Sequence, residues 1–340
     1  MAILINAYCT LREPPPLEFP HQLLGARDRT DPGLAPHLQG FIGYMVNLAG
    51  GQMTQTAYHI MRHIERVQRQ FSFNAVERDL DAVSRWARAA NAILYLPSGV
   101  ICDPSGQQLL PETGNNSKAQ VPYPGEAQER KARVMAQVSA LGIDAPPTLP
   151  PVISEPEVDL RPGSVVAKRC LALFVAAVRA ESLAAKQAIP IDELLSQFHL
   201  AVPAFTPKER TFIDTPSPSE QDVISFAWRY EALYLLEWVL GLAAELPFPT
   251  EICDVPLTAR LAIDNNVQQF VDSARLRPAG EILDALDLHY RLHWAVRQAR
   301  VDRREAPANL NPGVIQERHY ALNWLVRFED AEWDDVDTPT

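Results

Sequence analysis

Residues 219–246 read SEQDVISFAWRYEALYLLEWVLGLAAEL, and this segment determines what kind of domain the second half of the chain can form. It predicts one long helix, from Ser219 to about Glu245. Apolar side chains fall on nearly every side of that helix, which is typical of a helix in the middle of a domain. Because a buried charge costs several kcal/mol unless it is paired and hydrogen-bonded, we expect Arg229 and Glu231 to have partners on neighbouring helices.

The sequence on both sides of this segment is also helical in pattern. Ser164 begins a predicted helix that runs to about Gln187. Thr206-Pro-Lys-Glu209 is a capping box with proline at the first helical position, a specific signal for a helix start. Further helices are predicted after Gly280, to about Arg304, and over Val314–Phe328. We therefore expect residues 164–340 to form an all-helical domain.

The N-terminal part alternates between short apolar runs and segments with helical spacing. We expect strands at Ala2–Cys9, Gly40–Ala49 and Asn91–Leu96, a hairpin through residues 92–110, and helices at Gln52–Gln70 and Val76–Ala90. An apolar run as short as Gly40–Ala49 is also compatible with a buried helix. Alternation of this kind predicts a small α/β domain over residues 1–110.

Proline marks the region between these two parts, since ten of the 29 prolines fall between Pro104 and Pro162. We expect residues 111–163 to be a proline-rich connector that contains one helix, at Glu126–Leu141. The fold class predicted for the whole chain is α+β.

Composition excludes several classes of partner. The 340 residues include 31 basic and 42 acidic ones, which gives a net charge of −11. A nucleic-acid backbone or an anionic membrane surface requires clustered Lys and Arg, so we expect neither as the main partner. The charge-free stretch Gly33–Met61 is interrupted by polar residues and by Gly50-Gly51, and we expect no membrane span there.

The four cysteines occur singly, which argues against a disulfide scaffold or a zinc cluster and favours the reducing cytoplasm. The N-terminus has no basic region before its short apolar run and is not expected to be a signal peptide. The chain has no GxGxxG, GxxxxGK[ST] or GxSxG motif, so nucleotide-binding and α/β-hydrolase functions have no support.

Ionisable residues gather in residues 281–297, EILDALDLHYRLHWAVR. On a helix, His289 and His293 share one face, and Asp287 and Arg291 have the i,i+4 spacing of an ion pair. A third group follows in Glu317-Arg318-His319. The candidate site residues of this domain are Arg229, Glu231, Glu281, Asp284, Asp287, His289, Arg291, His293, Arg297, Glu317, Arg318 and His319.

Three interpretations of these residues stay open. The pair His289 and His293 could bind a divalent metal, with His319, Glu317 or an Asp as third ligand, although Tyr290 stands where the HExxH motif has glutamate. The charges and histidines could instead satisfy one another across packed helices and fix their register. They could also line a pocket for a ligand or a partner.

The chain ends in an acidic run, Glu329–Asp337, that contains Trp333. Acidic runs of this kind are usually solvated. A tryptophan inside the run indicates that the segment docks on the domain.

Several long blocks, in this order, resemble the bacterial family known as domain of unknown function 4272. The blocks are LPPVI, LRPGSVVAKR, SFAWRYEALYLLEWVLG, LRPAGEILDALDLHYRLHWAVRQAR, GVIQERHYALNWL and WDDVDT, within residues 126–338. One departure is Glu237, where a small or apolar residue is expected. The resemblance implies a bacterial, cytoplasmic protein and no particular activity. By analogy, some bacterial families of this kind serve as immunity or accessory proteins beside contact-dependent toxins.

The sequence thus favours a non-enzymatic interaction protein without a cofactor, whose acidic surface suits a basic protein partner. The alternative is a metal-dependent hydrolase in the helical domain. In that case His289 and His293 would be metal ligands, Glu317 or His319 would complete the site, and Arg229 or Arg291 would hold an anionic substrate.

Overall fold

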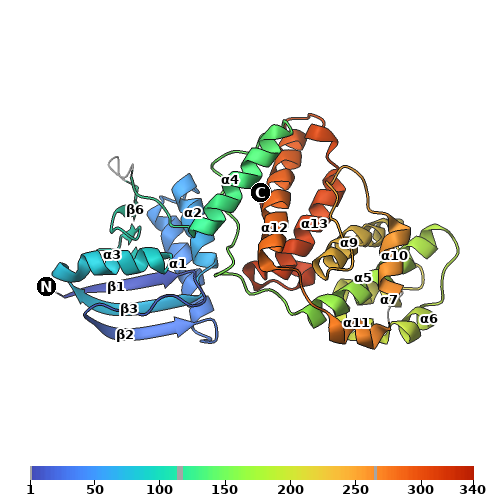
Figure 1. The fold of residues 1–340 in the computed structure, drawn as a ribbon, viewed down its shortest axis with the longest axis horizontal. Helices are drawn as coiled ribbons and strands as arrows, with labels where there is room; N and C mark the ends of the chain where they lie inside the picture. Colours follow the sequence, from blue (N-terminus) through green and yellow to red (C-terminus); the bar gives the residue numbers. More distant parts are fainter. Residues whose placement is uncertain (1, 113–117, 264–265) are drawn as a thin grey trace. The chain divides into compact units, whose positions relative to one another are not determined.

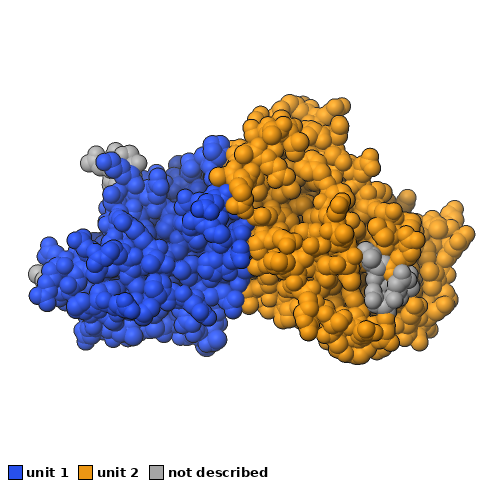
Figure 2. Space-filling view, in the orientation of Figure 1, with its two compact units in different colours: residues 1–131, 147–158 blue, residues 132–146, 159–340 orange. Residues whose placement is uncertain are grey.

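A computed structural model of the chain describes residues 2–112, 118–263 and 266–340. The chain forms two compact units, shown in different colours in Figure 2: unit 1 is residues 1–131 and 147–158, and unit 2 is residues 132–146 and 159–340. Unit 1 is built on an antiparallel sheet and unit 2 on helices, which confirms the α+β class (Figure 1). The expected connector, residues 111–163, contributes to both units, and its one helix is confirmed as α4, Gly125–Ala140.

Unit 1 contains one sheet with strand order β2-β3-β1-β4-β5-β6. Its described elements are β1 (Ala2–Cys9), β2 (His21–Asp28), α1 (Leu34–Leu48), α2 (Gln55–Glu65), β3 (Arg69–Val76), α3 (Leu80–Ala89), β4 (Ala92–Tyr95), β5 (Ile101–Cys102) and β6 (Gln108–Leu110). Each recorded strand pair is antiparallel, so the alternation of strands and helices does not build parallel βαβ units.

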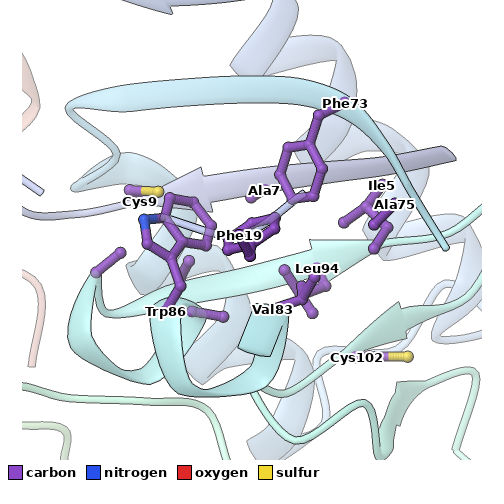
Figure 3. Packing of buried hydrophobic residues seen from close by; sticks show 13 residues of the cluster. Ile5, Ala7, Cys9, Phe19, Phe73, Ala75, Val83, Trp86, Leu94 and Cys102 are labelled. Carbon is purple, nitrogen blue, oxygen red and sulfur yellow. The ribbon is translucent and has the colours of Figure 1, made fainter. Parts of the chain in front are cut away.

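The two faces of the sheet are covered by different helices. Along β1, Ile5, Ala7 and Cys9 belong to one buried cluster that also contains Trp86 of α3 (Figure 3), whereas Tyr8 packs with residues of α1 and α2. This alternation follows from the strand period of two, which directs successive side chains to opposite faces. Unit 1 therefore has two apolar layers, one on each side of β1 and β4.

Three N-terminal segments differ from expectation. Gly40–Ala49 is not a strand but lies largely in α1, because Leu34, Leu38, Phe41 and Met45 recur at helical spacing and are buried along one side. Strands β2 and β3 are additions to the predicted elements. The side chains of β2 are almost all exposed, so the strand has no apolar pattern from which it could be recognised.

Unit 2 is helical, apart from short 3₁₀ turns, in its described residues. Its helices are the second half of α4, then α5 (Gly163–Ala184), α6 (Ile191–Gln197), α7 (Pro207–Asp214), α8 (Glu220–Ala227), α9 (Arg229–Val239), α10 (Val255–Ile263), α11 (Val267–Ser273), α12 (Ala279–Val301) and α13 (Pro312–Leu325). Helix α5 is buried along most of its length and lies against α8 and α9. In the described residues, no helix is both long enough and apolar enough to cross a membrane.

Local signals account for several of the helix boundaries. The capping box predicted at Thr206 is present and starts α7, with the Thr206 side chain accepting from the backbone N–H of Glu209. The single helix predicted from Ser219 is instead divided at Trp228 into α8 and α9, and it ends at Val239 rather than near Glu245. It ends there because Gly241 adopts a φ of +75° and the N–H of Leu242 donates to the carbonyl of Glu237, a glycine-terminated cap.

Gly163, the first residue of α5, lies very close to the backbone of Ala274, and this contact can be tested. A Cβ on Gly163 would lie 2.6 Å from the carbonyl oxygen of Ala274. Gly163→Ala is therefore expected to lower the free energy of unfolding of unit 2 by about 1–3 kcal/mol, because the backbone must shift. The matched control is Gly125→Ala, at the first residue of α4, where a Cβ would meet nothing within 4 Å. Equal unfolding midpoints for the two variants in urea would contradict this packing.

Candidate functional site

Two of the predicted residues form a fully buried ion pair on α12. Arg291 donates from Nε to Asp287 Oδ2 at 2.8 Å and from Nη2 to Asp287 Oδ1 at 2.7 Å. Both side chains are 0% exposed. The i,i+4 spacing allows this two-point contact within one helix, and charge-assisted pairs of this geometry are the strong kind. The pair thus lies inside the helical core, with both carboxylate oxygens of Asp287 accepting from Arg291.

A second buried pair links α13 to α9. Arg318 donates from Nε and Nη2 to Glu231 Oε2, at 3.3 Å and 3.2 Å, and from Nη1 to the carbonyl of Pro247 at 2.7 Å. The other carboxylate oxygen of Glu231 accepts from the backbone N–H of Cys253. One ion pair therefore holds α9, α13 and the segment after α9 together.

A third pair lies nearer the surface. Arg229 at the start of α9 donates from Nη1 to Glu317 Oε2 of α13 at 2.9 Å, with the two side chains 22% and 15% exposed. Burial raises the pKa of Glu317, and the guanidinium of Arg229 opposes that rise. Arg229, a candidate for substrate binding, and Glu317, a candidate metal ligand, are therefore bound to each other.

The three candidate histidines are buried on α12 and α13. Nδ1 of His293 and Nδ1 of His319 lie 2.9 Å apart in a hydrogen bond, so one of them donates and the other accepts. Nδ1 of His289 lies 2.8 Å from the carbonyl of Ala285 and must donate to it. Its Nε2 is then an acceptor, and it has no hydrogen-bond partner among the described residues.

Burial sets the charge of these histidines. It lowers the pKa of His289 to about 3 and that of His293 to about 4, and it holds the pKa of His319 well below 6.5. Each imidazole is therefore neutral at physiological pH. Within the described ranges, no group of three or more His, Cys, Asp or Glu side chains is arranged to hold a metal ion.

The neutral state of the buried histidines predicts how the unfolding free energy depends on pH. A histidine whose pKa is 6.5 when unfolded and about 3 when folded contributes stability above pH 6.5 that is lost as the pH falls. Between pH 7 and pH 5, His289 should lower the unfolding free energy by about 2 kcal/mol. His289→Gln should remove this loss, whereas His199→Gln, at an exposed histidine, should not. Parallel pH profiles for wild type and His289→Gln would argue against a neutral, buried His289.

Three predicted residues lie at the surface instead of in the buried network. Glu281 pairs with Arg277 at 3.3 Å and Asp284 with Arg133 at 3.0 Å, and both carboxylates are about half exposed. Arg297 is exposed, with its guanidinium 3.5 Å from the carbonyl of Thr338. These three residues therefore lie on a solvent-exposed side of α12, outside the buried network.

Sequence reasoning missed a third buried ion pair in unit 2. Arg169 of α5 pairs with Glu209 of α7, and both residues are nearly fully buried. Glu209 is also the capping-box glutamate and accepts from the backbone N–H of Thr206 at 3.0 Å. The capping box could be recognised in the sequence. The sequence did not show that Glu209 also pairs with Arg169, 40 residues earlier in the chain.

Glu237 of α9, at the position where a small or apolar residue is expected from the sequence, lies in the core. It is 0% exposed, and neither carboxyl oxygen has a hydrogen-bond partner among the residues that the structure describes. Burial raises its pKa to about 9, so the side chain is a neutral carboxylic acid at pH 7.

The acidic segment docks on unit 2, as Trp333 indicated. Trp333 is 3% exposed, with its ring 5.2 Å from the rings of Tyr320 and Trp324 and the guanidinium of Arg169 over it at 4.9 Å. Asp334 accepts from the backbone N–H of Lys208 at 3.0 Å. The run is thus held in place while Glu329, Asp330, Glu332, Asp335 and Asp337 remain exposed.

Unit 2 also carries a surface hollow of about 470 Å³ at the start of α5. It is lined by Pro162, Gly163, Ser164, Val271, Asp272, Ala274, Arg275 and Leu276. None of the candidate residues lines it, so the buried network and this hollow are separate features.

A family model described as Domain of unknown function (DUF4272) matches residues 130–336. The chain belongs to the DUF4272 family. The resemblance over residues 126–338 is thereby confirmed, and the DUF4272 region contains all three buried ion pairs, the histidines and the docked Trp333. Comparison with the curated proteins and with the solved structures gave no match.

Proposed function

We propose that this DUF4272 protein is a non-enzymatic, bacterial, cytoplasmic protein that acts by binding a basic protein partner. One observation carries the proposal: the ion pair on α12 and the ion pair between α9 and α13 are buried, and the charged groups of each pair are bonded to each other. Asp287 with Arg291, and Glu231 with Arg318, have side chains that are at most 3% exposed. Groups held in this way position helices and have no access to a substrate.

The distribution of charge supports a basic partner. The formal charge is −2 for unit 1 and −9 for unit 2, which together make the −11 of the whole chain. Six acidic residues fall within residues 329–337, and the docking of Trp333 fixes this segment on the surface of the domain. A fixed anionic surface attracts a cationic partner and raises its association rate.

The cysteines support the cytoplasmic part of the proposal. Cys9, Cys102, Cys170 and Cys253 are all free and buried. Unpaired cysteines suit a reducing compartment. An immunity or accessory role beside a toxin is the specific form of binding that the family analogy suggests.

Capture of the full-length protein from its native bacterial cells tests the proposal. We expect one stoichiometric, basic protein partner, retained at about 50 mM salt and lost at about 500 mM. A variant that neutralises four exposed acids of the docked segment should bind that partner at least tenfold more weakly. The four substitutions are Glu329→Gln, Asp330→Asn, Glu332→Gln and Asp335→Asn.

The matched control neutralises four exposed acids elsewhere in unit 2 and should keep the partner. These substitutions are Asp192→Asn, Glu193→Gln, Glu251→Gln and Glu305→Gln. Recovery of no stoichiometric partner, or equal affinity in the two variants, would overturn the proposed binding surface.

A further inference from the structure

Strand β2 is an uncovered edge of the sheet in unit 1. It pairs with β3 on one side and ends the strand order on the other (Figure 1). Seven of its eight residues are exposed, including Leu23 and Leu24, at 50% and 52%. An edge strand presents a row of outward N–H and C=O groups that can pair with another strand. Proteins often protect such edges with Lys or Pro, and β2, HQLLGARD, contains neither.

A bulge in β2 decides which side chains share a face. Leu23 pairs with Phe73 and Gly25 with Ser72, so Leu24 is the extra residue. Leu23 and Ala26 are three positions apart, yet they pair with Phe73 and Phe71, which both contact Trp86 on the α3 face. By the same register, His21 and Asp28 lie on that face, and Gln22 and Arg27 lie on the opposite one.

The order of residues in β2 is complementary to itself when the strand is reversed. If two copies meet antiparallel about the point between Leu24 and Gly25, the two members of each facing pair outside the bulge lie on the same face of the joined sheet. The pairs are His21 with Asp28, Gln22 with Arg27, Leu23 with Ala26, and Leu24 with Gly25. No like charges face each other among these pairs, and the cross-strand contacts are the kinds that stabilise sheets.

The bulge leaves room for the side chain of Leu24 at the point where the two copies would meet. Gly25 would face Leu24 of the second copy, and no heavy atom lies within 4 Å of a Cβ built on Gly25. Leu24, the bulge residue, is half exposed and can occupy that space. A bulge usually disrupts pairing at an edge, but here two bulges related by the two-fold axis would face each other and keep the register.

We propose that β2 is a self-association edge, at which two copies of this chain join their sheets antiparallel about Leu24 and Gly25. The proposal is independent of the basic partner, because β2 lies in unit 1 and the acidic segment in unit 2. Pairing of two eight-residue strands forms about eight hydrogen bonds. This interface is smaller than a standard one, so we expect a reversible dimer with a dissociation constant on the order of 10–100 µM.

A disulfide trap tests the register directly. Leu23→Cys mixed with Ala26→Cys should form a disulfide-linked heterodimer under mild oxidation, because these positions face each other. Either variant alone should cross-link at least tenfold more slowly, because identical positions then lie about 10 Å apart along the strands. The native cysteines are buried, and burial raises the pKa of the Cys102 thiol to about 11, so they do not compete.

Sedimentation equilibrium of the full-length protein gives the second readout. Wild type should be a dimer at high concentration, Leu24→Lys should be monomeric, and Val301→Lys, at a 75% exposed residue of unit 2, should behave as wild type. A monomeric wild type at about 200 µM, or equal cross-linking in the mixed and single cysteine variants, would overturn the proposal. If Leu23→Cys in a lysate forms cross-links only with a different protein, the edge binds a strand of that protein, and self-association is likewise overturned.

Discussion

Arg291→Met should lower the unfolding free energy of unit 2 by about 3–5 kcal/mol, because it leaves the carboxylate of Asp287 buried without a cation. Adding Asp287→Leu to this variant should restore stability to within about 1 kcal/mol of wild type, since two apolar side chains replace a desolvated ion pair. Both native side chains are 0% exposed, so water cannot compensate for the loss of either one.

Tryptophan fluorescence is the suitable probe for this double-mutant cycle. Five of the six tryptophans lie in unit 2, and only Trp86 lies in unit 1. The control is Glu281→Gln, which breaks a half-exposed ion pair on the same helix and should cost less than about 1 kcal/mol. A small loss for Arg291→Met, or a double variant as unstable as the single one, would show that the pair is not a desolvated structural contact.

Glu237→Gln should remove a pH dependence that makes the wild type less stable as the pH rises. Its carboxyl has an ordinary pKa of 4.5 and a folded pKa of about 9, so its proton stabilises the folded state fully below pH 4.5. That contribution is lost progressively as the pH rises towards 9. At pH 7, keeping the acid protonated in the core costs about 3 kcal/mol relative to the unfolded chain.

The expected result is a difference in unfolding free energy, variant minus wild type, that grows by about 1.4 kcal/mol per pH unit between pH 5 and 8. Glu245→Gln, at an exposed glutamate just after α9, should give a constant difference over the same range. Glu237→Met should be more stable than wild type at pH 8, because it also removes the unpartnered polar atoms. A difference between Glu237→Gln and wild type that does not change with pH would mean that the carboxyl has a partner or reaches water.

Local sequence signals were sufficient for part of the fold. The apolar run Ala2–Cys9 and the capping box at Thr206 both specified elements that the structure contains, because each signal lies within a few residues. The end of α9 at Gly241 also had a local signal, a glycine after an apolar helix, which the long apolar pattern outweighed. Strand β2 had none, because an exposed strand at a sheet edge is not selected for apolar alternation.

The candidate site likewise contains some contacts that the sequence could predict and others that it could not. The pair Asp287–Arg291 could be predicted from its spacing, because both residues lie on one helix. The contact between Arg318 and Glu231 joins residues 87 positions apart, and the sequence could only require that each buried charge has some partner. Helical spacing gives the face of a residue relative to its own helix, but the packing of other helices decides which face is wet. For this reason the sequence indicated Glu281, Asp284 and Arg297 as candidate site residues, although they lie at the surface.

We propose that the buried histidines and charges hold the helices of unit 2 together and do not form a catalytic metal site. The most direct test is the metal content of the purified, tag-free full-length protein, prepared without a strong chelator and measured by plasma mass spectrometry beside the His293→Ala variant. We expect far less than one metal ion per chain in both proteins, and a lower unfolding free energy for the variant, whose His319 loses its hydrogen-bond partner. About one zinc, manganese or iron ion per wild-type chain, lost in a variant that keeps its fold, would contradict it.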